Sequence, residues 1–188
     1  MEYIIVNNIT GRAWYAMKAS YGRALKAKDI LDSMAIENYV PMGYKKERVG
    51  GRNRITPVAV IPNLIFINAD VSQLKEVRVR INFIHHMLIK SEGKENVLEP
   101  IVVPDIEMSR FMKVIVDAQE SVKFVDLTIN SQIISKGTKV RVIDGEYIGY
   151  EGVLCRPKGS RAKKVLIDVC GLAPVELPVI DIELLEEI

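Results

Sequence analysis

The most informative hydrophobic pattern in the chain is a short apolar run at residues 61–68, IPNLIFIN. Five of these eight side chains are large and apolar, more than a strand with one hydrated face should carry, so the run predicts a strand buried on both faces. It is too short for a helix, which needs roughly ten residues or more. Because side chains alternate along a strand, Leu64 and Phe66 share one face, and Ile65 and Ile67 share the other. One face can therefore pack in a core while the other binds a partner.

The pattern around this run predicts alternating strands and helices. Strands are expected at residues 13–17, 39–42 and 82–89, and helices at residues 21–35, at 71–80 and after Asp105, which can cap the third helix. The apolar positions that share a helical face are Ala24, Ala27, Leu31, Met34 and Ala35, then Leu74, Val77 and Ile81, then Met108, Phe111, Met112 and Ile115. We expect these elements to form an α/β sandwich with one sheet.

A polar, basic segment at residues 43–54 interrupts this pattern, and its Gly50-Gly51 pair indicates a loop or a hairpin tip. Its cations are Lys45, Lys46, Arg48, Arg52 and Arg54. Clustered Lys and Arg are typical of contacts with nucleic-acid phosphates. A solvated turn explains the same residues equally well, and the sequence alone does not decide between the two.

The ends of the chain follow other patterns. Residues 1–12 form an N-terminal extension, either an extra strand or a loose arm. Residues 117–136 mix polar and scattered apolar side chains, which indicates a linker. From residue 137 the hydrophobic period is two, with a turn at Asp144-Gly145, so residues 137–188 predict a small β-barrel.

Composition narrows the possible functions. The 188 residues carry a net charge of only +2, so whole-chain charge does not imply a nucleic-acid partner. A second basic cluster at residues 156–164 could touch RNA, although a soluble turn explains it somewhat better. The two cysteines are typical of free thiols in a reducing compartment. The start of the chain lacks a signal-peptide pattern, and no apolar run is long enough to span a bilayer, so we expect a cytoplasmic protein without membrane contact.

An enzyme is not expected. The His85-His86 pair would point to opposite faces of a strand and could not bind a metal together as a helical pair does. No nucleophile with a base, metal cluster or Gly-rich phosphate loop can be assembled from the sequence, so we predict no catalytic residues, no metal and no cofactor.

Taken together, these elements resemble the NusG family of transcription elongation factors. In the first domain the likeness rests on Trp14-Tyr15, Val40-Pro41, the basic loop, residues 62–67 and the helix after Asp105. In the second domain it rests on residues 137–142, Asp144-Gly145, Gly152-Val153, Gly171 and residues 174–177, as in a KOW domain. The resemblance implies an α+β protein, with an NGN α/β sandwich of one mainly antiparallel sheet at residues 13–116 and an SH3-like KOW barrel at residues 137–188.

Finer features are similar to the UpxY-type antiterminators of Bacteroides relatives, which accompany capsular polysaccharide operons. These features are Tyr21-Gly22-Arg23, Ala27-Lys28, and residues 62–66, 101–105 and 136–141. The likeness implies an operon-specific antitermination factor.

The resemblance also implies partners and contact residues. Family members bind the clamp helices of the largest RNA polymerase subunit and suppress pausing, and the residues that match this contact are Lys18, Lys26, Leu64 and Phe66. Without the resemblance, apolar periodicity alone favours an ordinary core aromatic at Phe66. Arg78 and Arg80 lie near where relatives touch the non-template DNA strand, although a solvated helix end explains them equally well. Non-template DNA and nascent RNA are therefore further candidate partners.

The KOW domain in the general factor binds Rho or a small-subunit ribosomal protein. Its aromatic contact is replaced here by Cys170, which alternation places on an outward face with Leu166. Because aromatic residues dominate such contacts, the loss argues against Rho and leaves the ribosomal protein as a candidate. The alternative to a polymerase-bound factor is a KOW-type RNA- or ribosome-binding module without polymerase contact.

Overall fold

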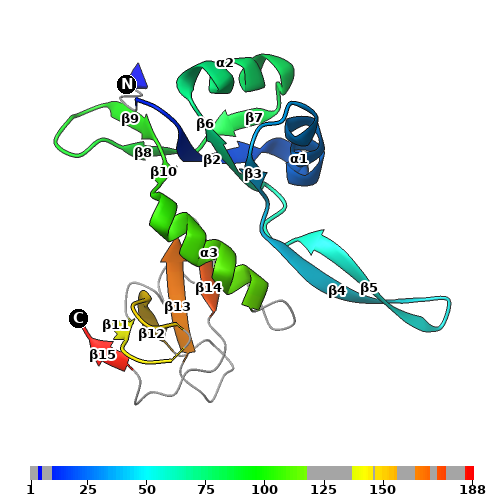
Figure 1. Ribbon diagram of the computed structural model, residues 1–188, viewed down its shortest axis with the longest axis vertical. Coiled ribbons are helices and arrows are strands. Elements are labelled where there is room, and N and C mark those ends of the chain that lie inside the picture. Colours follow the sequence, from blue (N-terminus) through cyan, green and yellow to red (C-terminus); the bar gives the residue numbers. More distant parts are fainter. Residues whose placement is uncertain are drawn as a thin grey trace. The chain divides into compact units, whose positions relative to one another are not determined.

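The computed structural model describes residues 4–5, 10–117, 137–145, 147–155, 164–169, 173–176 and 185–188 (Figure 1). The chain divides into two compact units, Met1–Ser109 and Arg110–Ile188. The functional boundaries expected from the sequence, with a linker at residues 117–136, remain predictions, because residues 118–136 lie outside the described part of the chain.

A five-stranded sheet forms the centre of the first unit. Its strands are β2 (Ala13–Ala19), β3 (Asn38–Tyr39), β6 (Leu64–Ala69), β7 (Ile84–His86) and β10 (Val102–Val103). β2 is the central strand and pairs antiparallel with β6 along one edge and with β10 and β7 along the other. β3 pairs with the far edge of β6.

The strand expected in residues 61–68 is confirmed from Leu64 onward, and it is buried on both faces as its composition predicts. Pro62 is not in the strand but in the turn before it, where the Leu64 amide donates to the Ile61 carbonyl at 3.0 Å. A residue without an amide hydrogen is tolerated there because the turn needs no donor at that position.

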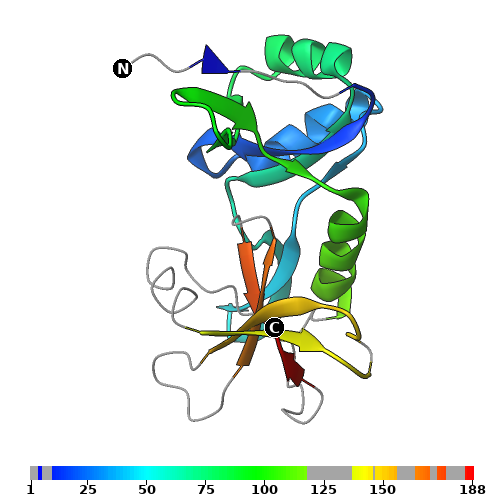
Figure 2. The same cartoon turned by 90° about the vertical axis from the view of Figure 1, so that its left-hand side faces the viewer.

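Two helices lie on the same side of the central sheet, as Figure 2 shows. They are α1 (Ala24–Ser33) and α2 (Val71–Arg80), and their buried side chains join those of β2 and β6 in one core cluster. α2 begins with a capping box: the Asp70 carboxylate accepts from the Gln73 amide at 2.8 Å, and the Asp70 amide donates to the Gln73 side chain. The helix predicted at residues 71–80 is therefore confirmed.

The helix predicted at residues 21–35 is too long at both ends. A 3-10 turn, η1 (Ser20–Gly22), replaces its start because Tyr21 has a φ of 60°, which is outside the helical region. Its end comes at Ser33, and Ala35 has a φ of 53° and is exposed rather than buried. Ala24, Ala27 and Leu31 do form the buried face, as their spacing predicts.

The basic segment forms the outer part of a long hairpin, which confirms the hairpin alternative and excludes the loop. β4 (Met42–Val49) and β5 (Arg52–Ala59) pair over their full length and are joined by Gly50-Gly51 (Figure 1). Both glycines have positive φ, 58° and 81°, as the favoured two-residue hairpin turns require. At about 3.4 Å per residue the hairpin is about 27 Å long.

A third sheet in the first unit corrects the prediction of a single sheet. It contains β1 (Ile4–Ile5), β9 (Val97–Pro100) and β8 (Leu88–Lys90), and the short β1 pairs parallel with β9. The expected strand at residues 82–89 is split between β7 and β8. The chain leaves the central sheet at Met87 and returns at Ile101, and both residues hydrogen-bond to the backbone of Ala16.

The helix predicted after Asp105 is confirmed as α3 (Asp105–Asp117), with Asp105 as its first residue rather than its cap. Met108, Phe111 and Ile115 are buried, as their helical spacing predicts. In the second unit, the Tyr150 hydroxyl donates to the Arg110 carbonyl of this helix at 3.3 Å.

The second unit contains a five-stranded antiparallel sheet. Its strands, in spatial order, are β14 (Ala173–Glu176), β13 (Lys164–Val169), β12 (Glu151–Cys155), β11 (Thr138–Val142) and β15 (Leu185–Glu187). The Arg141 guanidinium bridges the Glu151 and Glu186 carboxylates at 2.6 and 3.0 Å, which links three neighbouring strands. The described pairings establish a sheet, and its closure into a barrel stays a prediction.

Candidate functional site

The register of the central sheet places Leu64 and Phe66 on the side opposite α1 and α2. Ile65 and Ile67 belong to the core cluster that the helices cover, so the alternate residues of β6 face away from it. Phe66 pairs with Ala16 of β2 and with Tyr39 of β3. We use the term Phe66 face for the apolar centre of this side, which consists of Trp14, Ala16, Leu64, Phe66 and Val103.

Polar side chains lie around the Phe66 face. Lys18 pairs with Leu64 on one edge of β2 and with His85 on the other, and both polar residues are exposed. Tyr39 lies beside Phe66, and burial raises the pKa of its hydroxyl to about 12. The phenol is neutral at physiological pH, as an ordinary tyrosine is, and can donate a hydrogen bond.

The Phe66 face is buried in the chain. Leu64 is 3% exposed and Phe66 is fully buried, so neither side chain is accessible to a partner in this conformation. Of the other two residues matched to the polymerase contact, Lys18 is exposed beside Leu64, whereas Lys26 is exposed on α1, in the helical layer. The structure thus brings Lys18, Leu64 and Phe66 to one side of the sheet and places Lys26 on an element of the other side.

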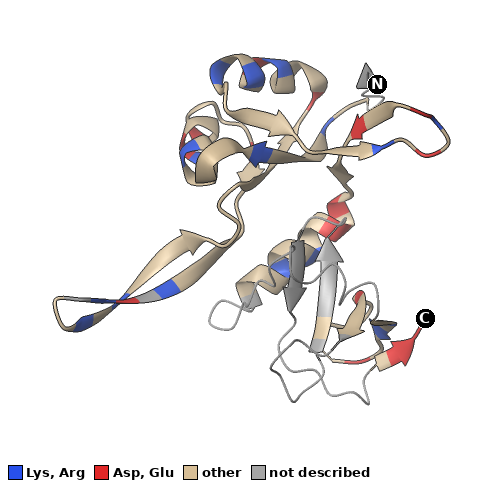
Figure 3. Ribbon diagram, turned by 180° about the vertical axis from the view of Figure 1, so that it is seen from behind, with Lys and Arg blue, Asp and Glu red and all other residues tan. Residues whose placement is uncertain are grey.

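The hairpin carries its cations on both of its faces. Lys45, Arg52 and Arg54 share one face with Glu47, and Arg48 lies on the other, as the register fixes. All four cations are exposed, while the side chain of Lys46 lies outside the described part. Figure 3 shows that Lys and Arg gather toward the outer end of the hairpin. Lys45 forms an ion pair of 2.7 Å with Glu47, and the hydrogen bond from that carboxylate raises the pKa of Lys45.

The face of the hairpin that carries Arg48 also exposes two large side chains that sequence reasoning did not single out. Tyr44 is 52% exposed and Ile55 is 59% exposed. Among the described strands none pairs with the outer edges of β4 and β5, and both faces of the hairpin carry exposed residues. The signal that could have identified them is the alternation in β4 and β5, which was hidden by the high charge of the segment.

Arg78 and Arg80 are exposed in the last turn of α2. Arg80 pairs with Glu76 one turn earlier at 3.5 Å, and cations in this position also stabilise the helix dipole. Burial, with a smaller contribution from the positive charge of Arg78, lowers the pKa of His86. Arg78 and Arg80 therefore have structural roles whether or not they also contact nucleic acid.

The two histidines point to opposite sides of β7, as the sequence predicts. His85 pairs with Lys18 on the Phe66 side, and His86 pairs with Met17 on the helical side, where its ring lies 5.9 Å from that of Tyr15. Among the described residues, no group of three or more His, Cys, Asp or Glu is arranged to hold a metal. Within the same residues, no helix is both long and apolar enough to cross a membrane.

The contact residues expected in the second domain can be placed only in part. Leu166 lies in β13, where it pairs with Val153 and Glu176, but its side chain is outside the described part, as is the whole of Cys170. Residues 156–163 of the second basic cluster are also outside the described part. Val165 is buried, in agreement with its predicted inward face.

Comparison with known families gives one match over the first unit. The family model described as "Transcription termination factor nusG" matches residues 12–112, which is more than half of the chain and extends from the start of β2 into α3. No curated protein matches the chain.

Proposed function

The chain belongs to the NusG family of transcription factors, and from that premise we propose that it binds RNA polymerase, promotes elongation and suppresses pausing and termination. The proposed partner is the clamp-helix region of the largest polymerase subunit. We place this activity in the cytoplasm, without a cofactor, a membrane or catalysis.

The observation that supports this proposal best is the two-sided burial pattern of β6. One side of the strand contributes to the core under α1 and α2, so stability alone explains Ile65 and Ile67. The other side is equally apolar although neither helix covers it. An apolar centre with Lys18, His85 and Tyr39 around it has the composition of a protein interface, in which an apolar core is surrounded by a polar rim.

Burial of Leu64 and Phe66 adds a condition to the proposal. Because both side chains are inaccessible in the free chain, binding through them requires a movement that first exposes the Phe66 face. A partner can drive such a movement only if it binds the exposed state more tightly than the covered state. The exposed state then accounts for a small population before the polymerase is added.

We propose further that the factor acts on a particular operon, as the UpxY-type antiterminators do on capsular polysaccharide operons. The support is the set of sequence features shared with that group, including Tyr21-Gly22-Arg23. The second unit is proposed to be a KOW domain that recruits a ribosomal protein rather than Rho, with Leu166 and position 170 at the contact. Its five-stranded antiparallel sheet is compatible with that domain.

A pull-down with core RNA polymerase and with an assembled elongation complex tests the polymerase contact. Phe66→Ala and Lys18→Glu should weaken binding about tenfold or more, since buried apolar anchors dominate interfaces. Ile67→Ala is the matched control, because it removes a buried side chain from the opposite side of the same strand. Each variant is assayed at a temperature at which circular dichroism shows it folded.

The results of this pull-down distinguish a wrong binding site from a wrong function. Equal binding by the Phe66→Ala and Ile67→Ala variants would exclude the Phe66 face while leaving the factor bound elsewhere. Failure of the unaltered chain to bind either polymerase sample would count against the proposed function as a whole. Transcription across a pause site then measures elongation directly.

The second candidate function is an RNA- or ribosome-binding module without polymerase contact, and the exposed cations of the hairpin favour it. Under this alternative, RNA binding should weaken steeply with salt and should survive polar replacement of Leu64 and Phe66. Under the polymerase proposal, those replacements abolish recruitment whatever the salt concentration.

A further inference from the structure

The outer edge of β4 is a row of backbone groups to which no described strand is paired. β4 and β5 form a two-stranded sheet by themselves, and among the described residues no backbone hydrogen bond from outside the hairpin reaches Tyr44 to Arg48. Figure 1 shows the outer part of the hairpin extending away from the rest of the first unit. A strand edge that is open in this way is a template for pairing with a further strand.

The geometry of the turn determines which backbone groups of β4 point outward. The two-glycine turn closes on the pair of Val49 and Arg52, and in such a turn the carbonyl of the first residue accepts from the amide of the fourth. Hydrogen-bonded and non-hydrogen-bonded pairs then alternate along an antiparallel ladder. Tyr44, Lys46 and Arg48 fall in the non-hydrogen-bonded pairs, so their amides and carbonyls point away from β5.

Pro57 gives the same assignment independently. It lies opposite Tyr44 in the register, and a proline is tolerated within a sheet where its nitrogen faces an open edge. The outer edge of β5 therefore lacks a donor at Pro57. β4 contains no proline, so its outer edge keeps every donor and is the better template of the two.

The side chains that accompany this edge lie on one face of the hairpin. We call it the Tyr44 face, and its described residues are Tyr44, Arg48, Asn53, Ile55 and Pro57, all exposed. Tyr44 and Ile55 are diagonal neighbours across the two strands, which is within reach of an aromatic ring. A strand added along β4 would therefore meet an apolar patch beside Tyr44 and a cation beside Arg48.

The charge of the hairpin selects the kind of strand that can be added. Residues 42–59 contain five Lys or Arg side chains and a single carboxylate, Glu47. Glu47 lies on the other face and pairs with Lys45 at 2.7 Å, whereas Arg48 forms no ion pair with a carboxylate of the described residues. A second copy of the hairpin would place cations against cations and be repelled, while an acidic strand would be attracted.

We propose that the outer edge of β4 binds an extended acidic segment of a partner protein as a third, antiparallel strand, with a carboxylate opposite Arg48 and an apolar side chain opposite Tyr44. Main-chain hydrogen bonds supply affinity in strand addition, and the alternate side chains supply specificity. A nucleic-acid backbone fits this edge less well, because phosphates only accept hydrogen bonds whereas the edge presents donors and acceptors in alternation.

The site goes beyond the polymerase contact proposed for the Phe66 face, and it is tested on the full-length chain without polymerase, so its failure would leave the proposed function standing. The probe is a fluorescein-labelled peptide in which Thr alternates with Glu, Glu and Val, so that an antiparallel strand places a Glu opposite Arg48 and the Val opposite Tyr44. Fluorescence anisotropy should show saturable binding.

Two further peptides of the same sequence separate strand addition from attraction between charges. One carries N-methyl groups on the Glu and Val amides, which face β4 in the added strand, and the other carries them on the Thr amides, which face away. The first should bind about tenfold more weakly or worse, because it loses its donors to the edge. The second should bind like the unmethylated peptide.

The variant that tests the side-chain contact is Arg48→Glu. It should weaken binding of the peptide about fivefold or more, and a peptide with Lys in place of both Glu residues should then bind better than the original. Arg52→Glu is the matched control, because it makes the same charge change on the other face of the hairpin. At about 0.15 M salt, where charges are screened beyond about 8 Å, it should alter binding by less than about twofold.

Four results would overturn the proposal. The unmethylated peptide could fail to bind at about 1 mM, or the two methylated peptides could bind equally, which would mean attraction by charge alone. An oligonucleotide of about twelve nucleotides could displace the peptide and lose affinity in Arg48→Glu but not in Arg52→Glu, which would assign the edge to nucleic acid. Dimers of the unaltered chain that the peptide dissociates would assign it to a second copy.

Discussion

The central sheet and the β4–β5 hairpin are both antiparallel β-structure in one unit, yet different forces hold them. The central sheet is fixed by burial: β6 is apolar on both sides, and a slip of one residue would turn every one of its side chains to the wrong face. The hairpin has exposed residues on both faces, and no further strand pairs with it in the part of the chain that the structure describes. Its register is fixed by the Gly50-Gly51 turn instead, which leaves its side chains free to carry charge.

The largest difference should appear when a large apolar side chain is truncated in each region. Ile67→Ala should lower the free energy of unfolding by about 2–5 kcal/mol, because Ile67 is fully buried in β6. Ile55→Ala in β5 should change it by less than about 0.5 kcal/mol, because that side chain is already hydrated. Urea unfolding followed by the fluorescence of Trp14, the single tryptophan, measures both. Similar losses in the two variants would mean that the hairpin packs against a partner surface.

Neutralising the hairpin should affect binding and spare stability. Replacing Lys45, Arg48, Arg52 and Arg54 by Gln should weaken oligonucleotide binding by on the order of 100-fold at about 0.1 M salt and reduce the salt slope by up to about 3. The unfolding midpoint measured by Trp14 should not fall. The matched control replaces four exposed lysines outside both basic clusters, Lys90, Lys94, Lys113 and Lys139. An unchanged salt dependence of binding would indicate that the hairpin cations contribute to solubility and do not contact nucleic acid.

A smaller effect is expected from the turn itself. A Cβ added at Gly51 would meet no atom within 4 Å, so Gly51→Ala tests only the positive φ, at a cost of about 1–2 kcal/mol. Gly50→Asn is the control, because Asn-Gly is a preferred pair in such turns. Hydrogen exchange should accelerate in the hairpin for the alanine variant alone, while the central sheet keeps its protection. Faster exchange throughout the unit would show that the two regions fold together.

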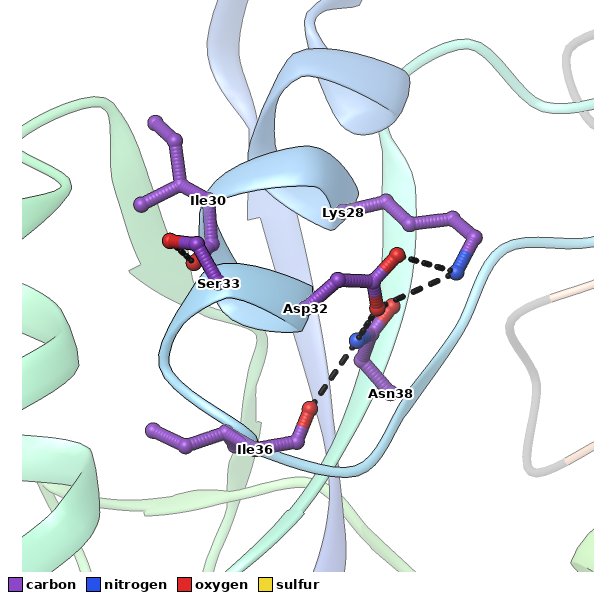
Figure 4. A network of polar contacts seen from close by, with 6 residues as sticks. All are labelled: Lys28, Ile30, Asp32, Ser33, Ile36 and Asn38. Carbon is purple, nitrogen blue, oxygen red and sulfur yellow. Dashed lines mark hydrogen bonds and ion pairs between the residues drawn. The ribbon is translucent and has the colours of Figure 1, made fainter.

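The smallest effect concerns the clamp that holds β3 against α1 at the edge of the central sheet (Figure 4). Hydrogen bonds from Lys28 and then Asn38 lower the pKa of Asp32 below its ordinary value. The ionised carboxylate therefore stabilises the fold above about pH 4, and this contribution is lost as the pH falls through the lowered pKa. Since the group is exposed, Asp32→Asn should cost a few tenths of a kcal/mol at pH 7 and nothing near pH 2. Urea titrations at pH 7 and at pH 2, with Asp29→Asn as control, measure the loss of unfolding free energy. An equal loss at both pH values would show that the charge of Asp32 does not stabilise the fold.

The sequence predicted correctly those elements in which burial requires apolar residues at a regular spacing. The split of β6 into an Ile65 side and a Phe66 side, the helix at residues 71–80 and the buried face of α3 all follow from apolar spacing, and the structure confirms them. The order of these elements along the chain also indicated the NusG family, which the family match confirms.

The sequence did not predict the local structure where contacts with distant segments determine the backbone conformation. Apolar spacing extended α1 back to Tyr21, but bonds to Phe83 and Pro62 force that turn out of the helix. The Gly50-Gly51 pair allowed either a loop or a hairpin tip, and the sequence could not choose between them because the high charge of the segment obscures the alternation in β4 and β5. Pairing of β1 with β9 depends on residues more than ninety positions apart, which no local pattern encodes. The apolar run predicted that Phe66 would be buried, but alternation alone does not show whether the chain itself or a partner covers that face.

The junction at Ala16 has a consequence for how this unit could be altered. The Met87 amide donates to the Ala16 carbonyl, the Ala16 amide donates to the Ile101 carbonyl, and Ile101 donates to Met87 at 2.8 Å, so the chain exits and re-enters the sheet at one point. The β8–β9 excursion between them is therefore an insert whose two ends meet at the sheet, and β9 in addition pairs with β1. It could be shortened, lengthened or exchanged for a foreign segment while the ends stay in register, which makes it the natural place to graft a reporter.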